Sequence, residues 1–265
     1  MTLPELSLRA VGLSAPGLPN WAEAQATLRG DLPWAEQDYV FQAPPQLPPN
    51  ERRRSTRITR LAFAACADAL TQAADLDPGR LSSIFASCSG DLDVIDAICR
   101  SLAQAPGAIS PLQFHNSVHN ASGGYWSIAT QAPGPSVSLS AFEGSLAAGL
   151  LEAALQLAEA PSTPVLLCAY DIAPPEPLRG ARPVHQPFAC SLLLEAGPVE
   201  GRPSIHLCPG VGGAESQMAD PGLEALRLNN PAARSLPLLQ AVAQGGGTLS
   251  LPSNQGPLRV ELRRP

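Results

Sequence analysis

Between residues 81 and 170 the chain alternates apolar segments of strand character with helical ones, and this alternation constrains the fold most. In chain order we expect a strand at residues 81–86, helices at 91–104 and 117–130, a strand at 136–141, a helix at 143–158 and a strand at 163–170. Strands that alternate with helices predict an α/β layer with a largely parallel sheet. With 45% hydrophobic residues among 265, the chain can build a sizeable core.

The flanking regions extend this pattern at both ends. Before it we expect a strand at 6–13, a helix at 21–28 capped by Asn20, a proline-rich loop at 31–50 and a helix at 51–74. Strands at 188–195 and 204–208, with no helix between them, end the layer, so its order is βαβαβαββ. Residues 196–235 are the best candidate for an irregular connection, before a helix at 236–243 and strands at 248–251 and 258–262.

Composition excludes several classes of function. All 17 basic residues are arginine, which excludes a lysine Schiff base, a Walker lysine and a lysine general base. The net charge of −6 argues against a nucleic-acid partner. No apolar run approaches a transmembrane segment, and we see no signal-peptide pattern at the N-terminus. The six cysteines occur singly in apolar segments, so we expect buried, reduced thiols in a cytoplasmic protein.

Two motifs suggest catalytic chemistry but fall short of it. His115 and His119 have the four-residue spacing of a zinc pair, yet no third ligand is evident. We therefore expect a hydrogen-bonded loop there, with no metal and no other cofactor. The string nearest to a G-x-S-x-G nucleophile elbow is Glu143-Gly144-Ser145-Leu146-Ala147, which lacks the glycine that should follow the serine by two residues.

Two further features are a run of arginines and a turn from a strand into a helix. A run of arginines lies in the helix expected at residues 51–74, namely Arg52, Arg53, Arg54 and Arg57. This run is either a solvated helix face or a docking patch for an acidic protein partner. The turn from the strand at 136–141 into the next helix places one side chain at a helix N-terminus, where enzymes hold a nucleophile. The residue there is Phe142 or Glu143 and is neither cysteine nor serine.

The middle of the chain resembles the N-terminal half of a β-ketoacyl synthase, of the thiolase fold. The residues that carry this resemblance are Ile109-Ser110-Pro111, Asn120, Gly124, Ser127-Ile128 and Gly134-Pro135-Ser136-Val137-Ser138. The string Phe-His-Asn-Ser-Val-His-Asn, with Gly124-Tyr125-Trp126, is similar to the chain-length-factor-like partner of bacterial aryl polyene pathways. The match covers about residues 5–197. It implies a thiolase-like half at 1–197 and a shortened, irregular C-terminal extension at 198–265, either a remnant second half or a cover for the sheet.

The resemblance also assigns site residues. The family's nucleophilic cysteine falls on Glu143, or on Phe142 after a slip of one residue, and neither side chain forms an acyl thioester. The family's second half supplies two histidines and a lysine, whereas here only His206 follows residue 197. The loop at 112–120 corresponds to the segment beside the partner's acyl tunnel, with Leu112, Gln113, Phe114 and Ser117 facing it. The strand at 136–141 corresponds to the edge strand that forms the dimer, with Ser136, Ser138 and Ser140 at the interface.

We therefore expect a non-catalytic, chain-length-factor-like subunit of a heterodimer. Its partners would be a full-length β-ketoacyl-ACP synthase, whose acyl tunnel it shapes during polyene or fatty-acid-type elongation, and acyl carrier protein. A bare edge strand followed by an apolar helix suggests that the pairing is obligate. Two alternatives stay open. One is a malonyl-ACP decarboxylase-like enzyme that uses Glu143, and the other is an acyl-carrier-protein-binding module that uses the arginines.

Overall fold

An eight-stranded mixed sheet organises the protein, and the computed structural model describes residues 3–104, 109–176 and 178–264. The strands are β1 (Leu6–Ser14), β2 (Ser82–Ala86), β3 (Ser136–Leu139), β4 (Val165–Asp171), β5 (Phe188–Ala196), β6 (Ser204–Pro209), β7 (Gly247–Leu251) and β8 (Leu258–Arg263). The helices are α1 (Trp21–Arg29), α2 (Pro49–Arg54), α3 (Arg57–Thr71), α4 (Leu92–Gln104), α5 (Pro111–Asn116), α6 (Ala121–Thr130), α7 (Ser145–Glu159), α8 (Pro221–Asn229) and α9 (Leu236–Gln244). The strand order is β3-β2-β4-β5-β1-β6-β8-β7, so β3 and β7 form the two edges.

Parallel pairing is confined to one end of the sheet. β2 pairs in parallel with β3 and with β4, whereas the other neighbouring strands among the described residues pair antiparallel. The expectation of a largely parallel sheet is therefore wrong beyond these three strands. Parallel strands need a helical crossover, and helices separate β2, β3 and β4 in the chain. β5 follows β4 without an α-helix, and β8 follows β7 directly, so these strands run antiparallel to their predecessors.

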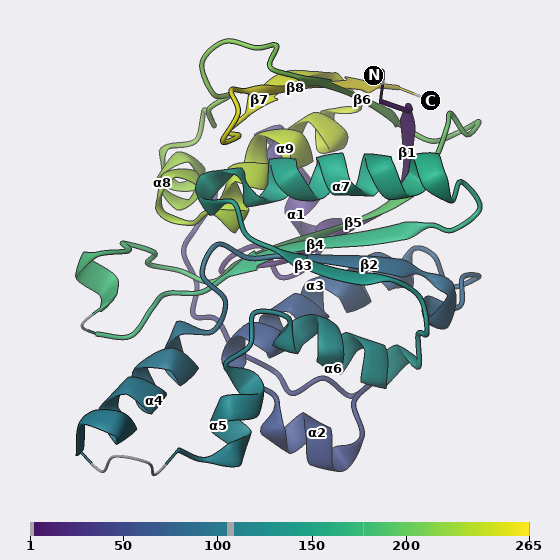
Figure 1. Ribbon diagram of the computed structural model, residues 1–265. Coiled ribbons are helices and arrows are strands. Elements are labelled where there is room, and N and C mark those ends of the chain that lie inside the picture. The colour runs from purple at the N-terminus through teal and green to yellow at the C-terminus, as the bar shows by residue number, and fades with distance from the viewer. Residues whose placement is uncertain (1–2, 105–108, 177, 265) are drawn as a thin grey trace.

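Helices and strands stack in alternating layers (Figure 1). α3 and α6 lie on one face of the central strands, and their apolar side chains share one core cluster with those strands. α7, α1 and α9 lie on the opposite face, within a second core cluster. β6, β8 and β7 cover α7 and α9 from the far side, and buried side chains of these strands complete the second cluster.

The apolar helix α7 is enclosed by the chain's own layers. Leu146, Leu150 and Leu157 are at most 1% exposed. A Cβ at Gly149 would lie 2.5 Å from Leu167 Cδ1, so glycine allows α7 to approach β4 closely. The interpretation of this helix as a surface that awaits a partner is wrong, because α9 and the C-terminal strands cover it. The edge strand β3, in contrast, lies at the edge as expected.

Some segments fold more regularly than their sequence suggested. Besides the expected strand β6, residues 196–235 contain the helix α8, which an irregular connection would lack. α8 begins where it does because Asp220 Oδ1 accepts hydrogen bonds from the backbone N atoms of Gly222 and Leu223 (2.8 and 2.9 Å). The loop expected at 112–120 begins inside α5, since Pro111 favours the first turn of a helix. The division of the chain at residue 197 stays a prediction.

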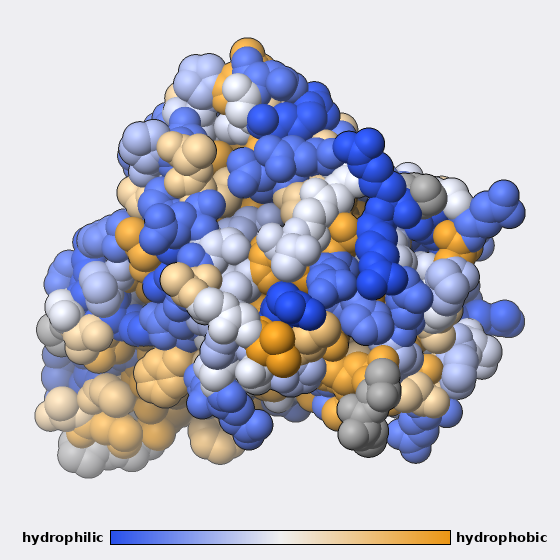
Figure 2. All heavy atoms as spheres, turned by 90° about the horizontal axis from the view of Figure 1, so that it is seen from above, coloured by the Kyte–Doolittle hydropathy of each residue, from blue (hydrophilic) through white to orange (hydrophobic). Residues whose placement is uncertain are grey.

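The exposed apolar side chains concentrate around α4, α5 and α6. We call six of them the α4–α6 apolar surface: Ile95, Leu102, Leu112, Phe114, Val118 and Ile128. The view onto β7 and β8 is largely hydrophilic by comparison, with hydrophobic residues gathered in the faded lower left, towards α4 and α5 (Figure 2). No helix in the described part of the chain has the length and apolar character needed to cross a bilayer.

Candidate functional site

Three parallel strands, β3, β2 and β4, end side by side, and a polar residue stands at or after each end. Ser140 follows β3, Cys88 follows β2 and Asp171 ends β4. Ser140 Oγ donates a hydrogen bond to the Cys88 carbonyl oxygen (2.7 Å), and Asp171 Oδ1 accepts one from the Cys88 backbone N (2.9 Å). Ligand sites of α/β proteins lie at this end of parallel strands. We call Cys88, Ser140, Glu143, Asp171 and Arg182 the strand-end cluster.

The turn from β3 into α7 has strained backbone at Phe142. Its φ of 51° lies in the left-handed region, which a bulky residue rarely adopts. Ser145 Oγ stabilises the turn, because it donates to the Phe142 carbonyl oxygen (2.7 Å) and accepts from the Ala141 backbone N (3.1 Å). The Phe142 side chain is 65% exposed. Strained strand-to-helix turns are where some enzymes present a nucleophile.

Arg182 connects two members of the strand-end cluster, Glu143 and Cys88. Its Nη1 donates to Glu143 Oε1 (3.0 Å), and its Nη2 lies 2.7 Å from Cys88 Sγ. Its guanidinium carbon also lies 5.5 Å from the centre of the Phe142 ring. Glu143 is therefore neutralised by a half-buried ion pair, and the head of α7 presents an aromatic ring instead of a thiol.

Burial dominates the electrostatics of the strand-end cluster. Asp171 is 4% exposed, and burial raises the pKa of its carboxyl group to about 7, against the opposing effect of hydrogen bonds from Ser87 and Cys88. Asp171 Oδ2 has no hydrogen-bond partner among the described residues. Burial also raises the pKa of the Cys88 thiol. This thiol is therefore protonated at neutral pH and is a weak nucleophile.

The residues expected beside an acyl tunnel lie on and just after α5. Leu112 and Phe114 are 41% and 66% exposed, while Gln113 and Ser117 are half-buried. Phe114 borders a groove of about 460 Å³ between α5 and α6, which Val118 and Ile128 also line. The structure therefore brings Leu112 and Phe114 onto the α4–α6 apolar surface. Ser117 instead donates a hydrogen bond to the Phe114 carbonyl oxygen (2.8 Å) and ends α5.

The three serines expected at an interface lie along and just beyond the edge strand β3. Ser136 Oγ accepts a hydrogen bond from Ser83 Oγ (3.0 Å), and both Ser136 and Ser138 face Gly123 of α6. Their side chains therefore point toward α6, and the backbone of β3 is the part that remains available at the sheet edge. Ser140 belongs to the strand-end cluster through its bond to Cys88.

The four arginines of the expected docking patch differ in availability. Arg52 Nη2 donates to the carbonyl oxygens of Pro45 and Leu47 (2.7 and 3.0 Å), and Arg57 forms an ion pair with Asp93 (2.6 Å). Arg53 and Arg54 are exposed and contact only their neighbours on α2, Asn50 and Glu51, among the described side chains. The available part of the patch is therefore Arg53 and Arg54.

The two histidines of the metal-like spacing have separate partners. The His115 ring lies edge-on to Tyr125, with 5.9 Å between ring centres, and His119 Nε2 lies 3.1 Å from the Ser87 carbonyl oxygen. Within residues 3–104, 109–176 and 178–264, no three His, Cys, Asp or Glu side chains are grouped so that they could hold a metal ion.

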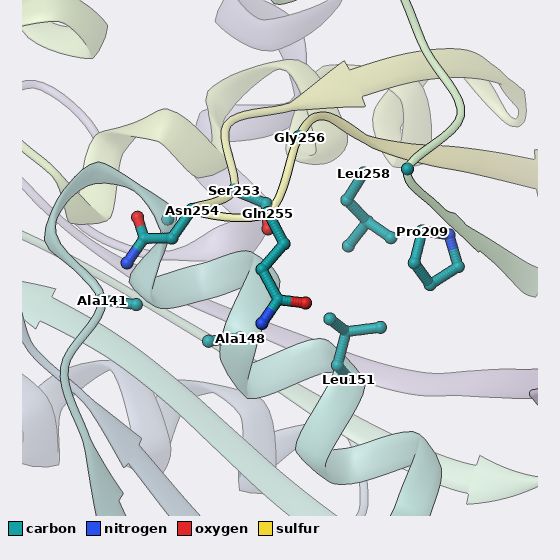
Figure 3. Close-up of a pocket in the computed structure, with 11 residues that line it drawn as sticks. Ala141, Ala148, Leu151, Pro209, Ser253, Asn254, Gln255, Gly256 and Leu258 are labelled. Carbon is teal, nitrogen blue, oxygen red and sulfur yellow. The ribbon is translucent and has the colours of Figure 1, made fainter.

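A separate pocket of about 470 Å³ lies between the first turns of α7 and the loop that joins β7 to β8 (Figure 3). Ala148 and Leu151 provide its apolar floor, and the side-chain amides of Asn254 and Gln255 reach toward it. A Cβ on Gly144 would lie 3.1 Å from Ser253 Cα, so glycine allows this loop to approach α7. The lining contains no titratable side chain, so the pocket offers space but no acid–base chemistry.

Cys88, Asp171 and Arg182 form part of one site that the sequence pattern did not predict. A usable signal existed for two of them, because Cys88 and Asp171 stand at the ends of predicted strands. Arg182 lies in a proline-rich loop with no periodic pattern, 39 residues from Glu143 and 94 from Cys88. Of the six free cysteines, Cys66, Cys168 and Cys190 are buried as expected, whereas Cys88 and Cys208 are half-buried and Cys99 is exposed.

The layered fold, with an edge strand that turns into an enclosed central helix, defines a thiolase-like protein of the ketosynthase type. Residues 20–255 match the family model described as β-ketoacyl synthase, N-terminal domain. The chain therefore belongs to the β-ketoacyl synthase N-terminal domain family. The match runs past residue 197, where the resemblance seen in the sequence ended, and it confirms the family and the thiolase-like α/β fold.

Solved structures of ketosynthases with chain length factors share this fold. A chain from the ketosynthase ApeO in complex with its chain length factor ApeC, from Xenorhabdus doucetiae, is 27% identical with a TM-score of 0.71, covering 98% of this chain and 99% of that one. The ishigamide ketosynthase/chain length factor is 13% identical, with a TM-score of 0.74 and coverage of 97% and 98%. The AntDE:AntF complex, a type II PKS acyl-carrier protein with its ketosynthase, is 12% identical, with a TM-score of 0.73 and coverage of 98% and 99%. Comparison with curated protein sequences finds no match.

Proposed function

We propose that this chain is a non-catalytic, chain-length-factor-like subunit that pairs with a full-length β-ketoacyl-ACP synthase and shapes its acyl tunnel. The main support is the 27% identity, over nearly the whole of both chains, to a chain of a ketosynthase–chain length factor complex. We extend the proposal to polyene elongation, by analogy with the sequence resemblance to aryl polyene pathways. We also assign it to the cytoplasm, and the six free cysteines support that assignment.

The head of α7 supports a non-catalytic role. A condensing enzyme needs a nucleophile and an activating base within hydrogen-bond reach. Phe142 and Glu143 supply no thiol or hydroxyl group, and Glu143 is paired with Arg182. Of the two residues, Phe142 has the strained backbone of an elbow, which favours it as the counterpart of the nucleophile.

The alternative of a malonyl-ACP decarboxylase that uses Glu143 has less support. Arg182 lies 3.0 Å from Glu143, so the carboxylate is held in an ion pair and is not free to act as a base. A guanidinium at that place would also stabilise a malonyl carboxylate in its ground state, which slows the loss of CO₂.

Acyl carrier protein is the second proposed partner. Carrier proteins are acidic, and the exposed Arg53 and Arg54 on α2 form a short basic patch. Two exposed arginines are worth little in a static complex and contribute mainly to the rate of encounter. This supports a docking contribution beside the ketosynthase, and not a free-standing carrier-binding module.

Co-expression with a full-length ketosynthase from the same gene neighbourhood tests the proposal. We expect the two chains to co-elute as one complex that elongates a carrier-bound acyl chain. A monodisperse chain that never co-elutes, or a chain that turns over a malonyl thioester alone, would overturn it.

Restoring a thiol should not create a synthase. We expect Phe142→Cys and Glu143→Cys, each in the isolated chain, to form no condensation product, because His206 is the one histidine after residue 197 and the histidine pair of the family's second half is missing. Mass spectrometry of carrier-bound products checks this. Turnover above the level of the unmodified chain, in either variant, would contradict the non-catalytic role.

Side-chain volume on α5 should change product length. In the reconstituted pair, we expect Phe114→Ala to lengthen the product or broaden its distribution, because a large wall is removed. We expect Ser117→Phe to shorten it. The product's mass and absorption maximum report the length, with co-elution of the pair as the control. Unchanged products in both variants would mean that α5 has only a structural role.

A further inference from the structure

Residues 178–187 form a segment, which we call the strap, that leaves the sheet after β4 and returns to it at β5. The returning end is well anchored, since Val184 is 5% exposed and Asn230 Nδ2 donates to the Gln186 carbonyl oxygen (2.8 Å). The outer part, residues 179–183, is exposed apart from Arg182. Among the described residues, the hydrogen bonds from this outer part to the turn before α7 and to the loop after β2 come from the Arg182 side chain alone.

We propose that Arg182 is a clasp that holds the strap closed over the strand-end cluster and positions Phe142 and Glu143. This inference concerns the chain by itself and goes beyond the proposed role in a heterodimer. In the closed arrangement one guanidinium contacts Glu143, Cys88 and the Phe142 ring together. Loss of those contacts releases the outer strap and uncovers Cys88.

The chemistry of the guanidinium suits this role. Its planar fork offers donors in fixed directions, so it can bind the Glu143 carboxylate and the Cys88 sulfur simultaneously while one face contacts an aromatic ring. An ammonium group offers a single charged point and no flat face. Arg182 is therefore not replaceable by lysine in a clasp with three different partners.

The backbone at Phe142 gives an independent reason for a clasp. The left-handed backbone conformation of Phe142 is unfavourable by itself and persists only where surrounding contacts hold it. Ser145 Oγ holds the Phe142 carbonyl oxygen by a hydrogen bond. The guanidinium of Arg182 contacts the Phe142 ring. Without Arg182, both the ring and the Glu143 carboxylate lose the contact that orients them.

Thiol labelling of the full-length chain tests the clasp, with iodoacetamide as the probe and mass spectrometry to resolve each cysteine. We expect Arg182→Gln to raise the labelling rate of Cys88 by about 10-fold or more, because local opening controls access to a half-buried thiol. Cys99, which is exposed, and Cys168, which is buried, serve as internal references and should keep their rates. Arg182→Lys should give an intermediate rate.

Arg179→Gln is the matched control, because it removes an exposed arginine from the same strap, where it pairs only with Glu176 among the described residues. It should leave the Cys88 rate unchanged. An unchanged or slower labelling rate of Cys88 in Arg182→Gln would overturn the proposal. If the strap stays closed, loss of the positive guanidinium only makes the Cys88 thiolate less favourable, which slows labelling. Should Arg182→Gln fail to fold, Arg182→Lys takes its place. A faster labelling rate of Cys88 in Arg182→Lys supports the clasp, and an unchanged rate overturns it.

Discussion

Ser138→Pro is expected to weaken pairing with the proposed ketosynthase partner strongly while it leaves this chain folded. The hydrogen bonds to β2 use the carbonyl oxygens of Pro135 and Leu139, so alternate residues face β2 and the backbone of Ser138 faces the open edge. Proline there removes a donor that only a partner strand would use, and edge strands tolerate it. We expect affinity to fall by about 100-fold or more, equivalent to about 3 kcal/mol.

Thr248→Pro provides the matched control on β7, the opposite edge of the same sheet. The backbone N and O of Ser250 bond to Ser216 outside the ladder with β8, so Thr248, two residues away, also faces outward. This variant should still bind the ketosynthase. Isothermal calorimetry or quantitative co-elution measures both affinities, with thermal unfolding as the test of folding. Normal binding by Ser138→Pro would exclude β3 as the interface.

Asp171→Asn is expected to stabilise the protein above neutral pH and to flatten its pH dependence. Burial raises the pKa of Asp171 from 3.8 to about 7, so ionisation of the folded state has a free-energy cost. The full shift corresponds to about 4 kcal/mol. Asparagine keeps one acceptor for Ser87 and Cys88 but adds two donors, so we expect a net gain of about 2 kcal/mol at pH 8.

The sign of the effect follows from proton binding. Between pH 4 and 7 the folded protein holds a proton on Asp171 that the unfolded chain has released. The free energy of unfolding therefore falls as pH rises through this window, by up to about 1.4 kcal/mol per pH unit from this group. Urea unfolding from pH 4 to 8 measures the slope, and Asp31→Asn, an exposed carboxylate, is the control. An unaltered slope in Asp171→Asn would show that Asp171 does not titrate in this range.

Local chemistry made most element positions predictable. Asn20 caps α1 by accepting from the Glu23 backbone N, as its type and place in the sequence indicate. Apolar periodicity likewise located α7, β4 and β5 to within a few residues. The predicted helix boundaries were wrong where a single residue leaves the helical conformation. The helix expected at 51–74 divides into α2 and α3, because Ser55 has extended backbone (ψ 132°).

Pairing direction and burial depended on the whole fold. The sequence marked α7 as strongly apolar, but that composition fits an exposed interface and an enclosed helix equally well. Only the stacking of β6, β8 and β7 over α7 distinguishes the two. Half of the exposed large apolar side chains lie instead on or near α4, α5 and α6, and of these the sequence had singled out only Leu112 and Phe114 as tunnel-facing, through the family resemblance.

Residue identity alone determined the family resemblance and the lack of a thiol at the head of α7, because both depend on which side chains occur at which spacing. The site around that turn was decided by tertiary structure. Cys88, Glu143 and Arg182 are far apart in the chain and meet only because β2 and β3 end side by side and an irregular strap returns over them. Loops without periodicity carry no signal of where they pack, so contacts made by such a strap become visible only when the strands that anchor it are in place.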